Sequence, residues 1–137
     1  MISCPIVAYS FAKLKWRGRN VLFVITIGVM MIPAQVTMIP LFLLFNQLGW
    51  VGTNLPLIVP AFFGVPFSIF LLRQFFKGLP DTLREAAKID GASEWRIYWQ
   101  IMFPLARPAV LAIALFQFMA SWTDFLGPLI YLTNETS

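Results

Sequence analysis

Charge is scarce in this sequence: 12% of its 137 residues are Asp, Glu, Lys or Arg, whereas 59% are hydrophobic. A soluble domain carries about a quarter charged residues, so this chain cannot cover its own surface with polar groups. The sequence also has no histidine and a single cysteine, Cys4. These absences exclude a disulfide within the chain and a Cys/His metal cluster, and we expect no metal site.

The longest stretch without charge runs from residue 20 to residue 72, which is 53 consecutive positions. As one helix it would be about 80 Å long, far more than the roughly 30 Å that the hydrocarbon core of a bilayer can hold. Two spans of about 20 residues with a short connector fit better. The pattern therefore predicts a membrane protein whose partner is the lipid bilayer.

We expect three complete spans, at about 21–45, 55–76 and 108–132, with a polar segment at about 77–107 between the last two. Residues 1–12 are apolar but too short to cross, and resemble the tail of another span. The second span extends over Arg73 and Lys77 if both side chains snorkel. Prolines inside the apolar runs predict kinked helices, which a membrane bundle tolerates: Pro33, Pro40, Pro60, Pro66 and Pro128.

The ten cations fall into two groups, within 13–19 and 73–107, and none lies in the connector 46–56 or after Leu132. Two spans separate the groups, so both face one side, which the positive-inside rule assigns to the cytoplasm. Residues of about 13–19 and 77–107 are thus expected in the cytoplasm. The net charge of +4 is a topology signal. It does not indicate a nucleic-acid partner, because the cations flank apolar spans and not exposed aromatics.

The segment "EAAKIDGASEWRIYWQIMFP", residues 85–104, is the most charged part of the chain and is predicted to form two short helices. Thr82 and Glu85 have the spacing of a capping box for the first helix, and Glu85 can also pair with Lys88. Gly91 stands where a helix ends in a left-handed residue. Ser93 is placed to cap the second helix, which we expect to close at Pro104.

The two predicted helices differ in their surfaces. The second carries an aromatic and apolar stripe at i, i+3, i+4 and i+7, which either packs on the bundle or lies in the membrane interface: Trp95, Tyr98, Trp99 and Met102. The first has small residues, Ala86 and Ala87, beside the polar Glu85, Lys88 and Asp90. Small residues let another backbone approach closely, so this helix is interpreted as a docking surface.

This segment resembles the EAA loop of the permease subunits of bacterial binding-protein-dependent ATP-binding-cassette importers. The family pattern is Glu-Ala-Ala, then a Gly, an Ile and a Leu-Pro close. Phe103 stands where Leu is usual, and the other matching positions agree: Glu85, Ala86, Ala87, Gly91, Ile101 and Pro104. The flanks "MIPAQVTMIPLFLLFNQLGW" and "SWTDFLGPLIYLT" are similar to the carbohydrate-uptake branch, in particular to the smaller maltose-type permease.

The resemblance implies an all-α fold, a polytopic transmembrane helical bundle with a cytoplasmic coupling helix. Family members have roughly six spans, whereas three spans of about 20 residues with their loops already fill this chain. We therefore interpret residues 1–137 as one permease transmembrane domain that is truncated at both ends.

The resemblance also implies partners and a mechanism. The loop becomes a coupling helix that inserts into a cytoplasmic ATP-binding subunit, with the docking residues Glu85, Ala86, Ala87 and Gly91 and their neighbour Asp90. ATP binding moves the coupling helices, and a pair of permease subunits switches from inward-open to outward-open. An extracytoplasmic solute-binding protein delivers the substrate. This chain itself is then not an enzyme and binds no cofactor, since the partner subunit uses the ATP.

Three polar or aromatic residues of the third span are candidates for the substrate path: Trp122, Asp124 and Gln117. An ionised group inside a bilayer is costly, so Asp124 is expected to face a cavity or a partner. Trp122 and Asp124 suit a sugar, because aromatic faces stack on sugar rings and carboxylates accept hydroxyl hydrogen bonds. The alternative for Asp124 is a hydrogen bond to a neighbouring helix, and for Gln117 a contact between helices.

Two other functions remain open from the residues. The same class of importer could carry a non-sugar solute such as a phosphodiester or a polyamine. A membrane adaptor without transport could use the basic loops to recruit a cytoplasmic protein. An integral membrane enzyme would need a nucleophile–base pair or metal ligands at one depth, which a chain with no His and one acid in its spans does not supply.

Overall fold

The computed structural model describes residues 3–132, and this part of the chain is helical with no strand. The all-α prediction is thus confirmed. The helical segments, in chain order, are α1 Ser3–Lys13, α2 Arg19–Met30, α3 Ala34–Gln47, α4 Leu55–Phe62, α5 Pro66–Gly78, α6 Asp81–Ile89, α7 Glu94–Ile97, the π-helical turn η1 Tyr98–Met102, α8 Phe103–Thr123 and α9 Leu126–Leu132.

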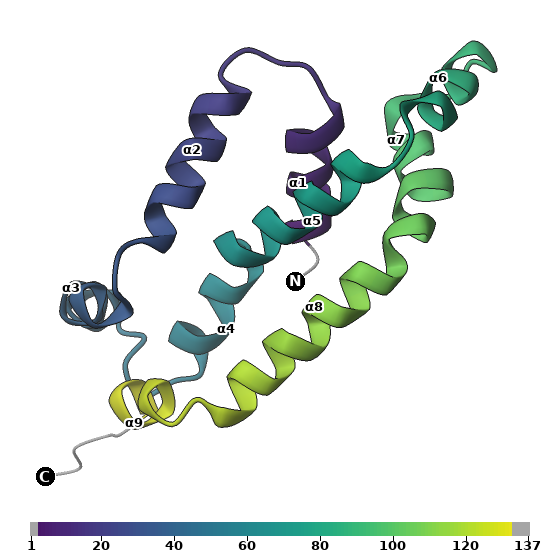
Figure 1. The fold of residues 1–137 in the computed structure, drawn as a ribbon. Helices are drawn as coiled ribbons and strands as arrows, with labels where there is room; N and C mark the ends of the chain where they lie inside the picture. The colour runs from purple at the N-terminus through teal and green to yellow at the C-terminus, as the bar shows by residue number, and fades with distance from the viewer. Residues whose placement is uncertain (1–2, 133–137) are drawn as a thin grey trace, which may run out of the picture.

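Helix α5 is the centre of the bundle. It packs along α1 and also contacts α2 and α8, which run on either side of it (Figure 1). The reason lies in its apolar spacing, since Ile69, Leu72 and Phe76 recur on one helical face and are almost fully buried. The outer faces of α2 and α8 remain apolar and exposed, as expected of helices in a lipid environment.

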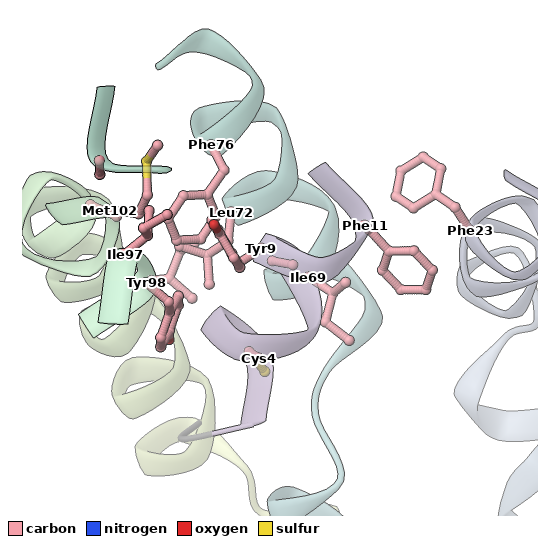
Figure 2. Close-up of a cluster of buried hydrophobic side chains, with 14 residues drawn as sticks. Cys4, Tyr9, Phe11, Phe23, Ile69, Leu72, Phe76, Ile97, Tyr98 and Met102 are labelled. Atoms are coloured by element: carbon pink, nitrogen blue, oxygen red, sulfur yellow. The ribbon is translucent and has the colours of Figure 1, made fainter. Parts of the chain in front are cut away.

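The densest packing joins α1, α5 and η1 near the end of the bundle that carries α6 (Figure 2). The ring of Tyr9 lies 5.6 Å from that of Phe76 and 5.1 Å from that of Tyr98, measured between centroids. Aromatic pairs at such distances add to the energy of apolar burial. Tyr9, which is 4% exposed, is therefore held firmly inside this core.

A buried cation lies within the second predicted span. The guanidinium carbon of Arg73 is 3.7 Å from the ring centroid of Phe23, and its Nε donates to the carbonyl of Phe11 over 3.4 Å. Arg73 is 9% exposed, so the prediction that it snorkels to the surface is wrong. A cation–π contact and a carbonyl satisfy it inside the bundle instead. Lys77 is exposed, as snorkelling requires.

The first predicted span, residues 21–45, is not one straight helix. Helices α2 and α3 meet at an angle of 97°, with the break between Met30 and Ala34. Pro33 stands at this break and has an extended backbone. The helix breaks there because proline has no N–H to continue the ladder of hydrogen bonds and disfavours a helical conformation in the residue before it. Pro40, inside α3, leaves that helix unbroken.

The other two predicted spans correspond to long helical stretches. Within the described residues, Leu55–Gly78 and Glu94–Thr123 are long and apolar enough to cross a membrane, and the bent α2–α3 pair would make a third span if it crosses as one. The third stretch differs from the expected 108–132 at both ends. It begins at Glu94 and stops before Asp124, whose backbone is extended, and α9 follows as a separate short helix.

Pro104 does not close the second helix of the polar segment, contrary to prediction. It lies in the first turn of α8, and the helix continues through it. The preceding turn widens into η1, in which the N–H of Phe103 bonds to the carbonyl of Tyr98, five residues back. The wider turn accommodates a residue with no N–H, so the chain keeps its direction from α7 into α8.

The connector between α3 and α4 lies at the opposite end of the molecule from α6, beside α9 (Figure 1). The N–H of Gly52 donates to the carbonyl of Tyr131 over 2.8 Å, and the ring of Phe45 contacts both Trp50 and Tyr131. Gly49 and Gly52 have positive φ, which glycine adopts without a steric penalty in turns. The polar connector and the charged segment thus occupy opposite ends.

Candidate functional site

The predicted docking segment forms an elbow, which we define as α6, residues 90–93 and α7; it projects from one end of the bundle (Figure 1). At its corner the N–H groups of Gly91 and Ala92 donate to the carbonyls of Lys88 and Ala87, each over 3.0 Å. Gly91 has φ of +80°, so the predicted left-handed helix end is confirmed. This pattern of backbone bonds satisfies the last carbonyls of α6 and fixes the turn.

The start of α7 agrees with the prediction and the start of α6 does not. Ser93 caps α7 by accepting the N–H of Arg96 over 3.3 Å. Helix α6 begins at Asp81, with Pro80 in the cap position, so Thr82 is inside the helix and forms no capping box. Proline suits this place because its extended ψ of 130° leads the chain directly into the first turn.

The outer face of α6 is exposed and carries a stripe of mixed character. Its members recur at i, i+3, i+4 and i+7, so they lie on one side of the helix: Thr82, Glu85, Ala86 and Ile89. Ile89 is 87% exposed, which is unusual for a large apolar side chain. The i, i+4 spacing of Glu85 and Ile89 already indicated that Ile89 belongs to this stripe, but the predicted docking surface included only small and polar residues.

Four of the five predicted docking residues are on the outside of the elbow: Glu85, Ala86, Asp90 and Gly91 are exposed. Ala87 is 8% exposed and belongs to the buried core, so it packs inward. A small residue is needed there because it lets α6 approach the bundle closely. The docking role of all five residues stays a prediction.

The inner face of α6 is held by the carboxylate of Glu94. Arg84 donates to this carboxylate with both Nε, over 3.2 Å, and Nη2. Lys88 lies 2.6 Å from the same group, so it pairs with Glu94 and not with Glu85 as predicted. The hydroxyl of Tyr9 donates to Glu94 Oε2 over 3.0 Å. We call these four residues the Glu94 cluster.

The Glu94 cluster is partly shielded from water, since the side chains of Arg84 and Glu94 are 16% and 32% exposed. The hydrogen bonds that Arg84 donates to Glu94 raise the pKa of the Arg84 guanidinium above its usual value. Sequence analysis missed the cluster because Tyr9 is 85 residues away from Glu94 along the chain. The i, i+4 spacing of Arg84 and Lys88 was the only local signal.

A second polar contact ties the start of α6 to the end of α1. The Nζ atom of Lys13 donates to the carbonyl of Leu79 and to Asp81 Oδ1, each over 2.7 Å. The Lys13 side chain is 4% exposed, and its hydrogen bond holds the pKa of Asp81 below the usual range. The two basic groups of the sequence therefore meet at one end of the molecule, as expected.

The predicted aromatic stripe of the elbow is divided between two environments. Tyr98 and Met102 are buried in the core, which agrees with the packing interpretation. Trp95 and Trp99 are 60% and 44% exposed and contact each other at 6.0 Å between ring centroids. Their exposure at the end of an apolar helix is typical of the membrane interface.

The three residues predicted for the substrate path do not share one site. Gln117 lines a cavity of about 430 Å³ between α5 and α8, together with Phe67, Ser68 and Phe116 among others. Trp122 is 79% exposed and its ring stacks on Phe118. Neither Trp122 nor Asp124 is part of that cavity lining.

Asp124 lies at the break between α8 and α9. Its Oδ1 accepts the N–H of Gly127 over 3.1 Å, so the carboxylate bonds to the first turn of α9. This bond is local, since the two residues are three positions apart in the sequence, and both predicted roles of Asp124 stay predictions. Because only one oxygen is used in it, Asp124 retains capacity to accept another donor.

A second cavity of about 410 Å³ lies between the α2–α3 bend and α5, lined by residues that include Thr37, Pro66 and Phe67. Val65 and Phe67 line both cavities, so the start of α5 separates them. The linings contain aromatic and aliphatic groups, one amide and two hydroxyls, and no charged residue. Such surfaces suit a neutral ligand that combines apolar faces with hydroxyls.

Comparison with known proteins gives a consistent result. Residues 4–136 match the family model described as "Binding-protein-dependent transport system inner membrane component". The arabinooligosaccharides transport system permease protein AraQ of Halalkalibacterium halodurans is 40% identical over 135 residues, which are 98% of this chain and 48% of the relative. The diacetylchitobiose uptake system permease protein NgcG of Streptomyces coelicolor is 36% identical over 129 residues, 93% of this chain and 43% of the relative.

The fold also matches a solved structure. A crystal structure of a bacterial ABC transporter involved in the import of the acidic polysaccharide alginate has a chain that superposes with a TM-score of 0.83 at 32% identity. The match covers 96% of this chain and 46% of that chain. The chain therefore spans about half the length of the proteins that it matches.

Proposed function

Because the chain belongs to the family of binding-protein-dependent transport system inner membrane components, we propose that it acts in a permease subunit of an ATP-binding-cassette importer. The match over residues 4–136 and the two long apolar helices support this proposal. The relatives are named as permeases and not as enzymes. In this proposal ATP is used by a partner subunit, and this chain contributes no cofactor site.

The observation that carries the proposal is the elbow. It projects from the bundle, its corner is fixed by Gly91, and its outer face is exposed and carries Glu85, Ala86 and Ile89 (Figure 1). A rigid, exposed helix with a small residue at its middle and a bare apolar side chain at its end suits insertion into a cleft of another protein. We propose that this other protein is a cytoplasmic ATP-binding subunit.

The proposed location is the bacterial cytoplasmic membrane, with residues of about 13–19 and 77–107 on the cytoplasmic side. The family and the membrane-length helices identify a bacterial membrane protein. The meeting of both basic groups at one end of the bundle supports the side, because cationic segments are retained in the cytoplasm. The connector at the other end would then face outward, toward a solute-binding protein.

The proposed substrate is a sugar or an oligosaccharide. Relatives are named for arabinooligosaccharides and diacetylchitobiose, and the matching structure for alginate. Gln117 with Phe67 in one cavity, and Trp122 with Asp124 near the end of α8, offer aromatic faces and hydrogen-bond groups for sugar hydroxyls. A second permease subunit would complete the path.

The docking role is tested by substituting Ala86→Arg in the assembled importer. A bulky side chain on the exposed stripe should keep the ATP-binding subunit away from α6. We expect the amount of this subunit that co-purifies to fall about tenfold, equivalent to a loss of roughly 1.4 kcal/mol of binding free energy. Sugar uptake into vesicles should fall with it.

The matched control is Gln100→Arg, which adds the same side chain at an exposed position of η1, away from α6. This variant should retain the ATP-binding subunit and uptake. Equal retention of the subunit by the Ala86→Arg variant would contradict the docking role. Sugar uptake by the unsubstituted importer without any ATP-binding subunit would contradict the proposed function as a whole.

A further inference from the structure

The Glu94 cluster brings together three elements that are far apart in the sequence. Glu94 is the first residue of α7, Arg84 and Lys88 lie on α6, and Tyr9 lies on α1. All three partners donate to the one carboxylate. Within residues 3–132, no other carboxylate accepts hydrogen bonds from more than one other helix. The cluster is therefore a junction and not an isolated surface pair.

Each arm of the junction is anchored differently. Tyr9 is fixed by its contacts with Phe76 and Tyr98 in the core. Glu94 continues into the helical stretch that ends at Thr123. Arg84 and Lys88 are one helical turn apart on the inner face of α6. A rotation of α6 about Gly91 would pull both cations away from Glu94 while Tyr9 stays in place.

We propose that Glu94 is a positioning residue that makes α6, α1 and the α7–α8 helix move as one body when a partner displaces the elbow. This inference rests on the proposed importer function and names the residue through which the coupling motion leaves the elbow. Backbone bonds at Gly91 hold the corner angle but do not reach α1. Lys13 and Asp81 join α1 to the start of α6 but not to α7. The side chain of Glu94 is the contact that joins α7 to both α6 and α1.

The burial of the cluster gives the connection its strength. An ion pair on an open surface contributes little, because water screens it and the side chains lose entropy. Arg84 is 16% exposed and donates two hydrogen bonds to Glu94. Removal of the Glu94 charge would therefore leave a partly buried cation without a counter-charge. Charge-assisted bonds of this kind are roughly twice as strong as neutral ones.

Three variants separate the contacts. Glu94→Gln removes the charge and keeps the shape of the side chain. Tyr9→Phe removes the hydroxyl that reaches Glu94 and keeps the ring in the core. This variant still tests the proposal if Glu94→Gln folds poorly. Arg84→Glu and Lys88→Glu combined with Glu94→Arg exchange the charges of both ion pairs and should restore them. Arg96→Gln is the control, since Arg96 is exposed on α7 and lies outside the cluster.

The first measurement needs no partner protein. Spin labels are attached to Ile89→Cys on α6 and Leu111→Cys on α8, which replace side chains that are 87% and 69% exposed. Cys4 is fully buried and will not react. We expect Glu94→Gln and Tyr9→Phe to broaden the distribution of distances between the labels, and the charge exchange and Arg96→Gln to leave it narrow. An unchanged width in both Glu94→Gln and Tyr9→Phe would overturn the proposal.

The second measurement uses the importer with its ATP-binding subunit. In the Glu94→Gln variant we expect ATP hydrolysis to continue and sugar transported per ATP to fall about tenfold, a change of roughly 1.4 kcal/mol. The charge exchange should recover this ratio. If uptake and hydrolysis fell together in constant proportion, Glu94 would only support folding and the proposal would be wrong. Failure of the unsubstituted chain to bind an ATP-binding subunit would instead defeat the proposed function and leave the spin-label result standing.

Discussion

At the scale of single residues, Asp124 has one role that the structure shows and one that we propose. It stands where α8 ends, and one of its oxygens accepts the N–H of Gly127 at the start of α9. We propose that its carboxylate also accepts a sugar hydroxyl. An amide can reproduce the first role without the charge, so Asn and Ala substitutions distinguish the two roles.

We predict that Asp124→Asn slows sugar uptake roughly tenfold while the ATP-binding subunit stays bound, because a hydrogen bond to a charged group contributes about 1.5–3 kcal/mol. Asp124→Ala should also lose the bond to Gly127, at a further cost in stability of about 1 kcal/mol. Initial uptake rates and thermal unfolding of the purified importer measure the two effects. Normal uptake by the Asn variant beside a destabilised Ala variant would leave Asp124 with the structural role alone.

At the scale of helical elements, Gly91 forms the corner where α6 turns into the start of α7. The added Cβ of any other residue would have open space around it, since nothing lies within 4 Å. The cost of a substitution is therefore a backbone cost: φ of +80° is unfavourable for an L residue by about 1–2 kcal/mol. Proline cannot adopt this φ at all and would lose the bond from Gly91 N–H to Lys88.

Gly91→Pro is thus expected to abolish uptake and leave insertion into the membrane intact, because it disrupts the corner of the elbow and none of the apolar helices. Gly91→Asn is the matched control, since Asn tolerates the left-handed conformation better than other L residues. It should retain most of the uptake. Transport assays paired with membrane fractionation give both quantities, and full uptake by the proline variant would exclude a coupling role for the turn.

Element boundaries also show how far the sequence could predict this structure. Gly91 and Ser93 were predicted correctly because their roles depend on neighbours within four residues. Pro33 and Pro104 could not be distinguished by type: the first stands at a 97° bend, and the second is absorbed by a widened turn. Whether a proline breaks a helix depends on the packing around it, which a local pattern does not contain.

The aromatic stripe divides along its two edges. Trp95 and Trp99 are four residues apart, as are Tyr98 and Met102, so each pair lies along one edge of the stripe. The first pair is exposed and the second is buried. The spacing predicted the stripe, but which edge faces the core depends on packing that the spacing does not contain. The Glu94 cluster was missed for a related reason, since its contact with Tyr9 joins distant parts of the chain.

At the scale of the whole molecule, the prediction of the fold class was the most successful. Scarce charge and long apolar runs were sufficient to indicate membrane helices, and the grouping of cations placed both basic segments at one end. Which side of the membrane that end faces is a separate prediction. It concerns exposed residues at both ends, so it can be tested with reagents that do not cross a membrane.

In intact cells we expect such a thiol reagent to label Thr53→Cys, in the connector, and to leave Ile89→Cys unlabelled. Both side chains are exposed, and the buried Cys4 gives no background. After permeabilisation, Ile89→Cys should also react when the ATP-binding subunit, which would cover this face of α6, is absent. Labelling of Ile89→Cys from outside would reverse the proposed orientation and would remove the cytoplasmic ATP-binding subunit as its partner.

The helical stretch from Glu94 to Thr123 has a mechanical consequence. Thirty residues at 1.5 Å each make a rod of about 45 Å, long enough to join the two surfaces of a membrane without a joint. If such a rod tilts by about 10° around its Glu94 end, its far tip sweeps roughly 8 Å. A small change of angle where the elbow joins the bundle would thus become a displacement of that size beside Trp122.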